Sequence, residues 1–422
     1  MPDKGKSGIG SHKIVAVIGA GIVGVACAIH LRRLGKQVML IDQAGPAEGA
    51  SYGNAGVLAC CAIVPVTTPG ILTRAPKMLF GRDGPLFLKW GYLPKLIKFL
   101  IPYLWASKID TVKHVAQNMV PLLENSVDEH FNLSEGSHAR TWLKKSPYMF
   151  VYKNRAAYEA DAFTWDMRKK YGFKWEVLEG EDIQKHEPSI SSVYKCAVLL
   201  QDHGFINNPG EYVKDLAKTA VTNGAKLRIA TVENILQTDN GVTIKTDDGD
   251  ILAEDVIIAT GAWSSTLAKK HGANVPLESE RGYHVVLEEP NIKTTMPVMD
   301  ASRKFVTVPT SDGLRLAGIV EFGGLNALPS QGPIDLLLRG IKELLPTIKY
   351  KSMQKWMGHR PATADSLPVI GRSPTSKNVY FGYGHHHVGL TAGPITGRLL
   401  AEMVAGLQPN IDLHAYRSDR YS

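Results

Sequence analysis

The chain has few cysteines, and none in a spacing that builds a structural site. Of its 422 residues only Cys27, Cys60, Cys61 and Cys196 are cysteines, and no two of them form a Cys-x-x-Cys pair. This composition disfavours a disulfide scaffold and favours a reducing compartment, so a cytoplasmic protein is expected. The adjacent Cys60 and Cys61 could form a redox pair, but small buried side chains are the simpler interpretation.

Long basic segments and a long apolar segment near the N-terminus are also absent from the sequence. The sequence has no extended basic run and no zinc-ligand spacing, so neither a nucleic-acid partner nor a metal site is expected. Residues 1–12 are polar and basic and lack the apolar segment of a secretory signal. They are predicted to be a disordered lead-in to the first strand.

What is present describes a globular protein of more than one domain. Hydrophobic residues make up 44% and charged residues 21% of the chain, and 422 residues exceed one ordinary core. The 48 Lys and Arg against 40 Asp and Glu give a net charge of +8. This excess indicates a generally basic surface, or a preference for an anionic substrate or an acidic membrane.

The chain opens with the pattern of a βαβ unit. Residues 13–18 form an apolar run typical of a buried parallel strand, and residues 22–34 predict a helix that ends at Gly35. Residues 38–41 predict a second strand, with Asp42 at its carboxyl end. These elements frame a glycine-rich turn.

That turn, Gly19-Ala-Gly-Ile-Val-Gly24, predicts a dinucleotide site. Its first glycine permits a tight turn, Gly21 lets the backbone approach a pyrophosphate, and the last lets helix pack on strand. Asp42, 18 residues beyond Gly24, is placed to accept hydrogen bonds from a ribose and would repel a 2′-phosphate. The cofactor contacts predicted here are Gly19, Gly21, Ile22, Val23, Gly24, Asp42 and Gln43.

The rest of the chain predicts a second, mostly antiparallel sheet and a few helices. The expected helices are 156–171, 209–223 with Asn208 as N-cap, and 394–405. The expected strands are 148–152, 226–231, 242–246, 256–259, 284–287, 305–308 and 314–317.

Small-residue segments recur far from the first turn. They are Ser51–Gly56, Ala259–Trp263, Gly358–Gly371 and Gly382–Thr391. Glycine-rich elements more than 300 residues apart indicate one cofactor held from both ends of the chain. That arrangement is typical of flavoenzymes.

Together these motifs resemble the FAD-dependent amine oxidoreductases, the group of D-amino-acid dehydrogenase small subunits, glycine oxidases and sarcosine oxidases. The resemblance runs from Lys13 to Tyr421, although residues 60–145 carry no motif of the group. It implies an α/β fold, with a Rossmann-type FAD-binding domain and an interleaved α+β substrate domain on a mostly antiparallel sheet.

The implied domains are discontinuous. The FAD-binding domain is expected to comprise residues 13–90, 205–275 and 355–422, and the substrate domain residues 91–204 and 276–354.

The resemblance also implies site residues. Arg360, in Gly-His-Arg-Pro, is expected to bind the substrate carboxylate as a bidentate, permanently charged group. Tyr283 is expected to assist, while His284, His359 and Tyr383 are weaker candidates.

The loop before the last helix departs from the family pattern. Where the family usually has Gly-His-Gly, this chain has three histidines, and His386 and His387 are expected to line the substrate pocket or to tune activity with pH. A metal site there is the less favoured alternative. The loop and the helix dipole behind it would stabilise charge on the reduced flavin.

The remaining FAD contacts implied are Ser51, Asn54, Ala55, Gly56, Val232, Thr260, Gly261, Trp263, Gly384, His385, Val388, Gly389, Leu390 and Thr391. The FAD is expected to be non-covalent, because Asn54 stands where tethered relatives have histidine and no cysteine follows Cys196.

The implied reaction is oxidative deamination of a small D- or cyclic amino acid. Hydride would pass from Cα to flavin N5, giving an imine that hydrolyses to a 2-oxo acid. Alternatives are oxidation of an N-methyl amine or an aminophosphonate, or a flavin electron-transfer subunit of a larger complex. The electron acceptor is left open among O2, a quinone and a partner protein.

Residues 85–107 are rich in aromatic and aliphatic side chains, but three prolines and three lysines interrupt them, which excludes a transmembrane helix. Either short helices pack over the FAD-binding domain here, or the segment lies in a membrane interface. The second alternative would place the protein at the inner face of the membrane.

Overall fold

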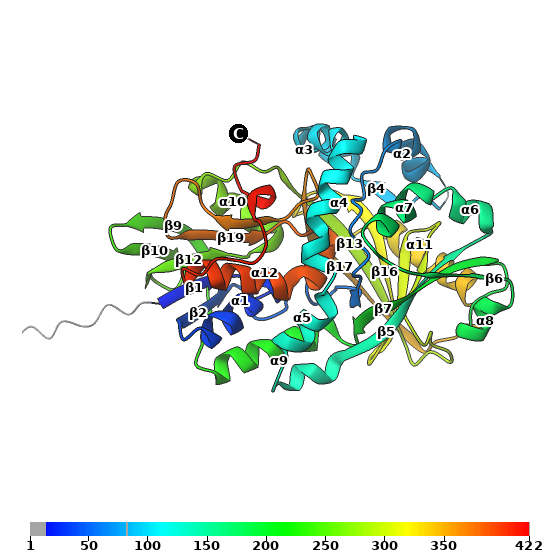
Figure 1. Ribbon diagram of the computed structural model, residues 1–422, viewed down its shortest axis with the longest axis horizontal. Coiled ribbons are helices and arrows are strands. Elements are labelled where there is room, and N and C mark those ends of the chain that lie inside the picture. Colours follow the sequence, from blue (N-terminus) through cyan, green and yellow to red (C-terminus); the bar gives the residue numbers. More distant parts are fainter. Residues whose placement is uncertain (1–13, 82, 422) are drawn as a thin grey trace, which may run out of the picture.

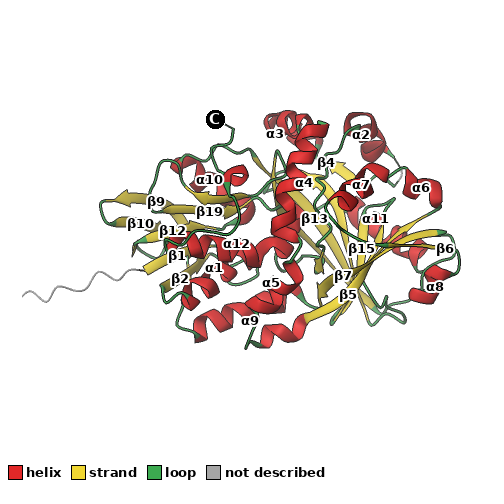
Figure 2. Ribbon diagram, viewed as in Figure 1, coloured by secondary structure: helices red, strands yellow, loops and turns green. Residues whose placement is uncertain are grey.

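The computed structural model describes residues 14–421 except residue 82, so the predicted lead-in lies outside the described residues. The described chain forms two halves, each built on its own large sheet (Figures 1 and 2). Helix α4 (Ile109–Leu123) stands between them.

The first half confirms the predicted βαβ opening. Its six strands are, in spatial order, β18 (Val369–Arg372), β19 (Val379–Tyr383), β12 (Asp255–Ile258), β1 (Ile14–Ile18), β2 (Gln37–Asp42) and β8 (Lys226–Ile229). All neighbours are parallel except β18 and β19. Residues 15–18 of β1 are all buried, as expected of a strand covered on both faces.

Helices cover one face of this sheet and a small sheet covers the other. The helices are α1 (Ile22–Arg33), α9 (Pro209–Thr222) and α12 (Gly389–Val404). The small sheet consists of β9 (Val232–Thr238), β10 (Gly241–Thr246) and β11 (Ile251–Ala253), with α10 (Ser264–Ala268) beside it. Helices α1 and α12, from opposite ends of the chain, pack side by side (Figure 1).

The second half is the expected mostly antiparallel sheet. Its main path is β17 (Ser352–Thr363), β13 (Leu277–Glu288), β16 (Gly313–Phe322), β15 (Phe305–Thr310), β14 (Val298–Asp300), β5 (Leu143–Tyr152), β7 (Cys196–Ile206) and β3 (Val57–Leu58). Strands β4 (Leu86–Leu88) and β6 (Glu176–Glu179) pair with β16 and β7. Helix α11 (Gly332–Leu344) packs its apolar face on this sheet.

Strand membership crosses the expected domain ranges. Strands β3 and β4 and most of β17 pair in the second sheet, although these residues fall in ranges expected for the FAD-binding domain. The chain therefore passes between the two sheets more often than the sequence indicated.

The single helix predicted for residues 156–171 is wrong, because two helices occupy that range. They are α6 (Arg155–Glu159) and α7 (Ala162–Lys170). The break falls at Asp161, whose carboxylate accepts hydrogen bonds from the hydroxyls of Thr164 and Tyr152. A side chain that bonds locally in this way favours a new helix start over continuation.

The remaining helices lie beside the second sheet and towards the boundary between the halves. They are α2 (Ile71–Phe80), α3 (Leu93–Trp105), α5 (Ser126–Leu133) and α8 (Asp182–His186). Residues 85–107 thus form β4, a short turn and one helix, which buries Leu96, Phe99 and Tyr103. No helix among the described residues is long and apolar enough to cross a membrane.

The closing helix begins at Gly389 and not at Pro394 as predicted. Pro394 has no N–H, so it cannot bond the Leu390 carbonyl in the usual helical pattern. His130 on α5 supplies the donor instead, with Nε2 2.9 Å from the Leu390 oxygen. Its Nδ1 lies 2.7 Å from the Tyr212 hydroxyl, and burial lowers the pKa of His130 to about 4, which keeps the ring neutral.

Replacing His130 with alanine is expected to lower the free energy of unfolding by about 1–3 kcal/mol, because the Leu390 carbonyl and the Tyr212 hydroxyl lose their partner. In a Pro394→Ala background the restored N–H can reach that carbonyl, so the loss should be smaller. Urea unfolding of the four proteins of this double-mutant cycle measures the difference. Equal losses in both backgrounds would contradict the assignment.

Candidate active site

A cavity of about 1130 Å³ extends from the glycine turn to the face of the second sheet and on to α2 and α3. Pockets for ordinary small ligands measure roughly 300–1,000 Å³. The cavity therefore has room for a dinucleotide and a substrate together. Both halves of the molecule contribute to its wall.

At one end, the turn after β1 has the geometry that a pyrophosphate requires. Gly19 has φ +102°, and a Cβ there would lie 2.4 Å from the Ala259 carbonyl oxygen. A Cβ on Gly24 would lie 1.8 Å from the Gly19 oxygen, so only glycine allows α1 to start this close to β1. The start of α1 directs its free N–H groups and its positive dipole end towards the cavity.

Two side chains hold this turn in place. The Ala20 N–H donates to Asp42 Oδ2 at 2.7 Å, and the Ile22 N–H donates to Ser51 Oγ at 3.0 Å. Asp42 Oδ1 also accepts from the N–H groups of Ala44 and Gly45. Asp42 thus shapes the turn as well as facing the cavity.

Most of the cofactor contacts expected from the sequence line this cavity. They are Gly19, Gly21, Ile22, Val23, Asp42, Gln43, Ser51, Asn54, Ala55, Val232, Thr260, Gly261, Trp263, His385, Val388, Gly389, Leu390 and Thr391.

Three expected contacts, Gly24, Gly56 and Gly384, lie behind the wall. Each is a place of close backbone packing: a Cβ on Gly56 would lie 2.5 Å from the Ile206 oxygen, and one on Gly384 2.5 Å from Thr363 Cγ2. These three glycines allow the backbone to pack closely and do not face the cavity.

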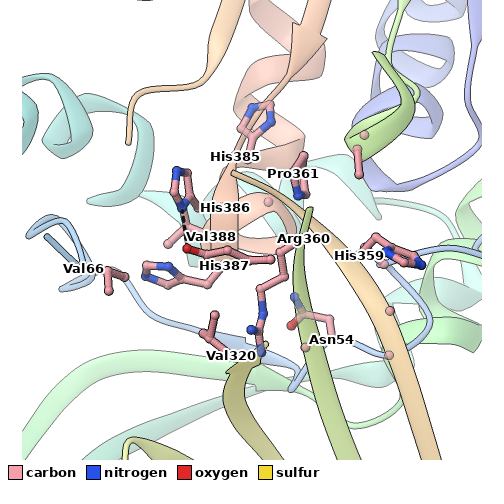
Figure 3. A pocket seen from close by; sticks show the side chains of 18 of the residues that line it. Asn54, Val66, Val320, His359, Arg360, Pro361, His385, His386, His387 and Val388 are labelled. Atoms are coloured by element: carbon pink, nitrogen blue, oxygen red, sulfur yellow. Dashed lines mark ion pairs between the residues drawn. The ribbon is translucent and has the colours of Figure 1, made fainter. Parts of the chain in front are cut away.

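Arg360 on β17 points into the cavity between Val320 and Asn54 (Figure 3). Its guanidinium passes over Gly282, where a Cβ would lie 2.5 Å from Arg360 Cζ. It donates to the Gly318 carbonyl at 2.6 Å and to the Ile319 carbonyl at 3.2 Å.

No carboxylate of the described residues lies within 4.0 Å of the Arg360 guanidinium. Burial lowers the pKa of Arg360, and the charge of Glu280 opposes that shift. A buried guanidinium held by neutral carbonyls retains donors and charge for an anionic ligand.

The three consecutive histidines point in different directions (Figure 3). His385 is buried against the Thr396 hydroxyl at 2.9 Å, and His387 projects into the cavity near Val66. Burial lowers the pKa of His385 to about 3, with His386 adding to the shift, so this ring is neutral at pH 7. The His387 ring is exposed to the cavity, and its partial enclosure shifts its pKa in the same direction.

His386 takes a left-handed backbone conformation with φ +49°, which is uncommon for a residue with a side chain. Its Nε2 donates to the Thr363 carbonyl at 2.8 Å, and its Nδ1 lies 3.9 Å from Glu280 Oε1. The three rings diverge and so do not form a common ligand set. Among the described residues, no group of three or more His, Cys, Asp or Glu could hold a metal ion.

Tyr283 does not offer a free hydroxyl to a substrate. The hydroxyl donates to Glu321 Oε2 at 2.5 Å and accepts from the Ser330 N–H at 2.9 Å. Burial raises the pKa of Tyr283 to about 12, with Glu321 adding to the shift. The sequence expectation of a carboxylate contact is therefore not supported by this geometry, which uses the hydroxyl inside the second half.

The weaker candidates also have structural partners. His284 stacks on Trp356 and bonds the Gly53 carbonyl, and His359 bonds Ser279. Tyr383 is buried in the core of the first half, although one side faces the cavity.

Sequence reasoning missed two contributions to the site. Glu280 and Tyr103 line the cavity and bond each other at 3.1 Å, and helices α2 and α3 form much of its apolar wall. The strand pattern around 284–287 could have been extended back to Glu280. Nothing in residues 60–145 indicated that this segment reaches the site.

The comparisons with known proteins agree with this geometry. The family described as FAD dependent oxidoreductase matches residues 15–403. A D-amino-acid oxidase of Bradyrhizobium diazoefficiens is 35% identical over 96% of this chain and 98% of its own length. D-amino acid dehydrogenase 1 of Mesorhizobium japonicum is 26% identical over 96% of this chain and 99% of its own length.

Solved structures share the fold. The glycine oxidase of Geobacillus kaustophilus superposes with a TM-score of 0.75 at 21% identity, covering 96% of this chain and 98% of that one. The L-proline dehydrogenase of P. horikoshii gives 0.72 at 19% identity, covering 97% of each chain. A Rossmann-type glycine turn, a cavity that spans both halves and a family match over nearly the whole length lead to one conclusion: the chain belongs to the FAD dependent oxidoreductase family and is an FAD-binding enzyme.

Proposed function

We propose that this enzyme oxidises a free D-amino acid whose carboxylate is bound by Arg360. The observation that carries the proposal is the buried guanidinium with two carbonyl partners and no carboxylate within 4.0 Å among the described residues. The relatives named D-amino-acid oxidase and D-amino acid dehydrogenase support the substrate class.

The cofactor would lie along the cavity. Its adenosine and pyrophosphate would occupy the Gly19–Gly24 turn beside Asp42, and its ring would face the loop at His385–Leu390. Bound FAD would supply the two-electron acceptor for the Cα–H bond. The start of α12 at Gly389 offers a positive dipole end to negative charge on the ring. Because none of the four cysteines lines the cavity, we propose non-covalent binding.

The chain's own side chains would position the substrate. Arg360 fixes the carboxylate end. Enclosure in the cavity lowers the pKa of His387, which favours the neutral ring, and a neutral ring can accept a hydrogen bond from the amino group. Holding both ends would align the Cα–H bond with the cofactor, and such positioning supplies much of the catalysis in reactions of this type. The product imine would then hydrolyse to a 2-oxo acid.

We further propose that the enzyme docks on an anionic membrane through the α2–α3 face. This face consists of Leu72, Phe80, Trp90, Ile97, Ile101 and Trp105, each between 45% and 72% exposed. The rings of Phe80 and Trp90 stack at 5.9 Å and join α2 to the turn before α3. Both helices lie along the same edge of the molecule, at the top of Figure 1.

The excess of basic residues in this segment supports an anionic bilayer as the partner that this face contacts. Residues 66–108 contain seven Lys and Arg and a single carboxylate, Asp83, which is paired with Arg303. Exposed aromatic and aliphatic side chains among lysines are typical of interfacial helices. The inner sides of α2 and α3 line the cavity with Leu79, Leu96 and Leu100. An apolar passage between cavity and membrane would suit a lipid-borne quinone as electron acceptor.

Replacing Arg360 with lysine is expected to raise KM for the amino acid by about 10–100-fold, because one ammonium cannot reproduce a bidentate guanidinium. Anaerobic mixing with D-amino acids, glycine, sarcosine, D-proline and an aminophosphonate would measure bleaching of the flavin band. Arg372→Lys, outside the cavity, is the matched control and should keep the wild-type KM. If no amino acid bleaches the wild-type flavin, the substrate class is wrong.

Replacing Gly24 with alanine is expected to abolish FAD retention, since the new Cβ would lie 1.8 Å from the Gly19 oxygen. Purified protein would show the loss as a low ratio of flavin to protein absorbance. Gly91→Ala, where a Cβ meets nothing within 4 Å, should retain FAD. Equal flavin content in the two variants would contradict the proposed position of the pyrophosphate.

Replacing Lys95 and Lys98 with glutamate is expected to reduce co-sedimentation with vesicles of mixed zwitterionic and anionic phospholipid by at least about fivefold, since each basic residue near the surface contributes about 1 kcal/mol. Lys226 and Lys245, on strands far from α3, provide a matched double substitution. Wild-type protein that stays in the supernatant would exclude the membrane contact.

A further inference from the structure

A buried carboxylate lies beside Arg360 without pairing with it. Glu280 on β13 is 1% exposed and stands directly opposite Arg360 in the antiparallel register of β13 and β17. Residues in such cross-strand positions are close enough for their side chains to meet. An acid and a guanidinium placed in this way would ordinarily form an ion pair.

Two other residues lie against the Glu280 carboxylate instead, and one of them donates a hydrogen bond to it. The Tyr103 hydroxyl on α3 donates to Glu280 Oε1 at 3.1 Å, and His386 Nδ1 lies 3.9 Å from the same oxygen, drawn as the dashed line in Figure 3. Burial raises the pKa of Tyr103 well above its usual value, with Glu280 adding to the shift, so its hydroxyl keeps its proton and stays a donor.

The backbone of His386 directs the ring to this place. Its φ of +49° is a strained value for a residue with a side chain, and such strain persists only where the surroundings impose it. Because Nε2 donates to the Thr363 carbonyl, Nδ1 is left facing Glu280 and has no hydrogen-bond partner among the described residues. An ion pair with Glu280 therefore requires the imidazolium form of His386, with a proton on each ring nitrogen.

Arg360 turns the other way. Its guanidinium lies over Gly282, two residues along β13 from Glu280, and donates to carbonyls on β16. Only a glycine at 282 leaves space for this position, because a Cβ there would lie 2.5 Å from Arg360 Cζ.

We propose that Glu280 is a positioning residue, which His386 and Tyr103 hold away from Arg360 so that the guanidinium stays available to the substrate carboxylate. Without these two partners, Glu280 turns to Arg360 and competes with the substrate. The inference rests on the proposed function in that Arg360 binds a carboxylate. On this proposal, the unusual histidine at position 386 raises the affinity of the site for a carboxylate and takes no part in the transfer of electrons.

The test uses the FAD-loaded enzyme and benzoate, a simple carboxylate that cannot be oxidised. Its binding is followed by the change in flavin absorbance. His386→Gly keeps the left-handed backbone without the ring and is expected to weaken benzoate binding on the order of tenfold, a typical coupling between neighbouring sites. Tyr103→Phe should weaken it by a smaller factor. With substrate, KM should rise while kcat changes little.

The decisive variant is the double substitution His386→Gly/Glu280→Gln. A neutral amide no longer competes for Arg360, so benzoate affinity should return to near the wild-type value. Benzamide, uncharged and of the same shape, should show no such pattern. If His386→Gly leaves benzoate binding unchanged, or if Glu280→Gln does not restore it, the proposal is overturned.

The same experiment separates this inference from the proposed reaction. Wild-type enzyme that binds benzoate, with the expected pattern among the variants, but that oxidises no amino acid would overturn only the reaction. Wild-type enzyme that binds no carboxylate would overturn both the Arg360 assignment and the role of Glu280.

Discussion

The buried charge of Arg360 is the constraint on which the site depends. A guanidinium within the protein needs oxygen partners. Here two backbone carbonyls of β16 satisfy part of it, and no carboxylate of the described residues lies within 4.0 Å of it. The arrangement requires the antiparallel register of β13 with β17, and a glycine at 282 over which the side chain can lie. The second sheet thus serves as a platform that holds one charge at the edge of the cavity.

The first half supplies the complementary element, a loop that closes the cavity from the other side. The chain leaves β19, turns through Gly384 at φ +84°, and enters α12 five residues later. Three histidines on that short path take three directions because each finds a different environment: the Thr396 hydroxyl, the Thr363 carbonyl and the cavity. Burial favours the neutral form of an imidazole over the charged form, which agrees with the low pKa of the buried His385.

Local sequence patterns predicted much of the fold, and sequence motifs predicted many of the residues that line the cavity. The apolar run of β1, the glycine turn and Asp42 all lie within residues 14–42, in one βαβ unit, so the sequence predicted their geometry. Arg360 was found through a resemblance, which gave its type and place but not its partners. The break at Asp161 and the early start of α12 were missed. Asp161 also accepts a hydrogen bond from Tyr152 on β5, and His130 on α5 donates to the Leu390 carbonyl, and the local pattern shows neither contact.

By itself, the sequence determined the cofactor class, the Rossmann opening and the residue that carries the positive charge, since these depend on residues close together or on a motif with fixed spacing. Only the tertiary structure decided which side chains surround that charge. Tyr103, Glu280 and His386 come from a helix, a strand and a loop far apart in the chain, and they meet because the two sheets face each other across one cavity. The tertiary structure also decided that the Tyr283 hydroxyl is not free. Its partners Glu321 and Ser330 come from other segments, which no local pattern around residue 283 indicates.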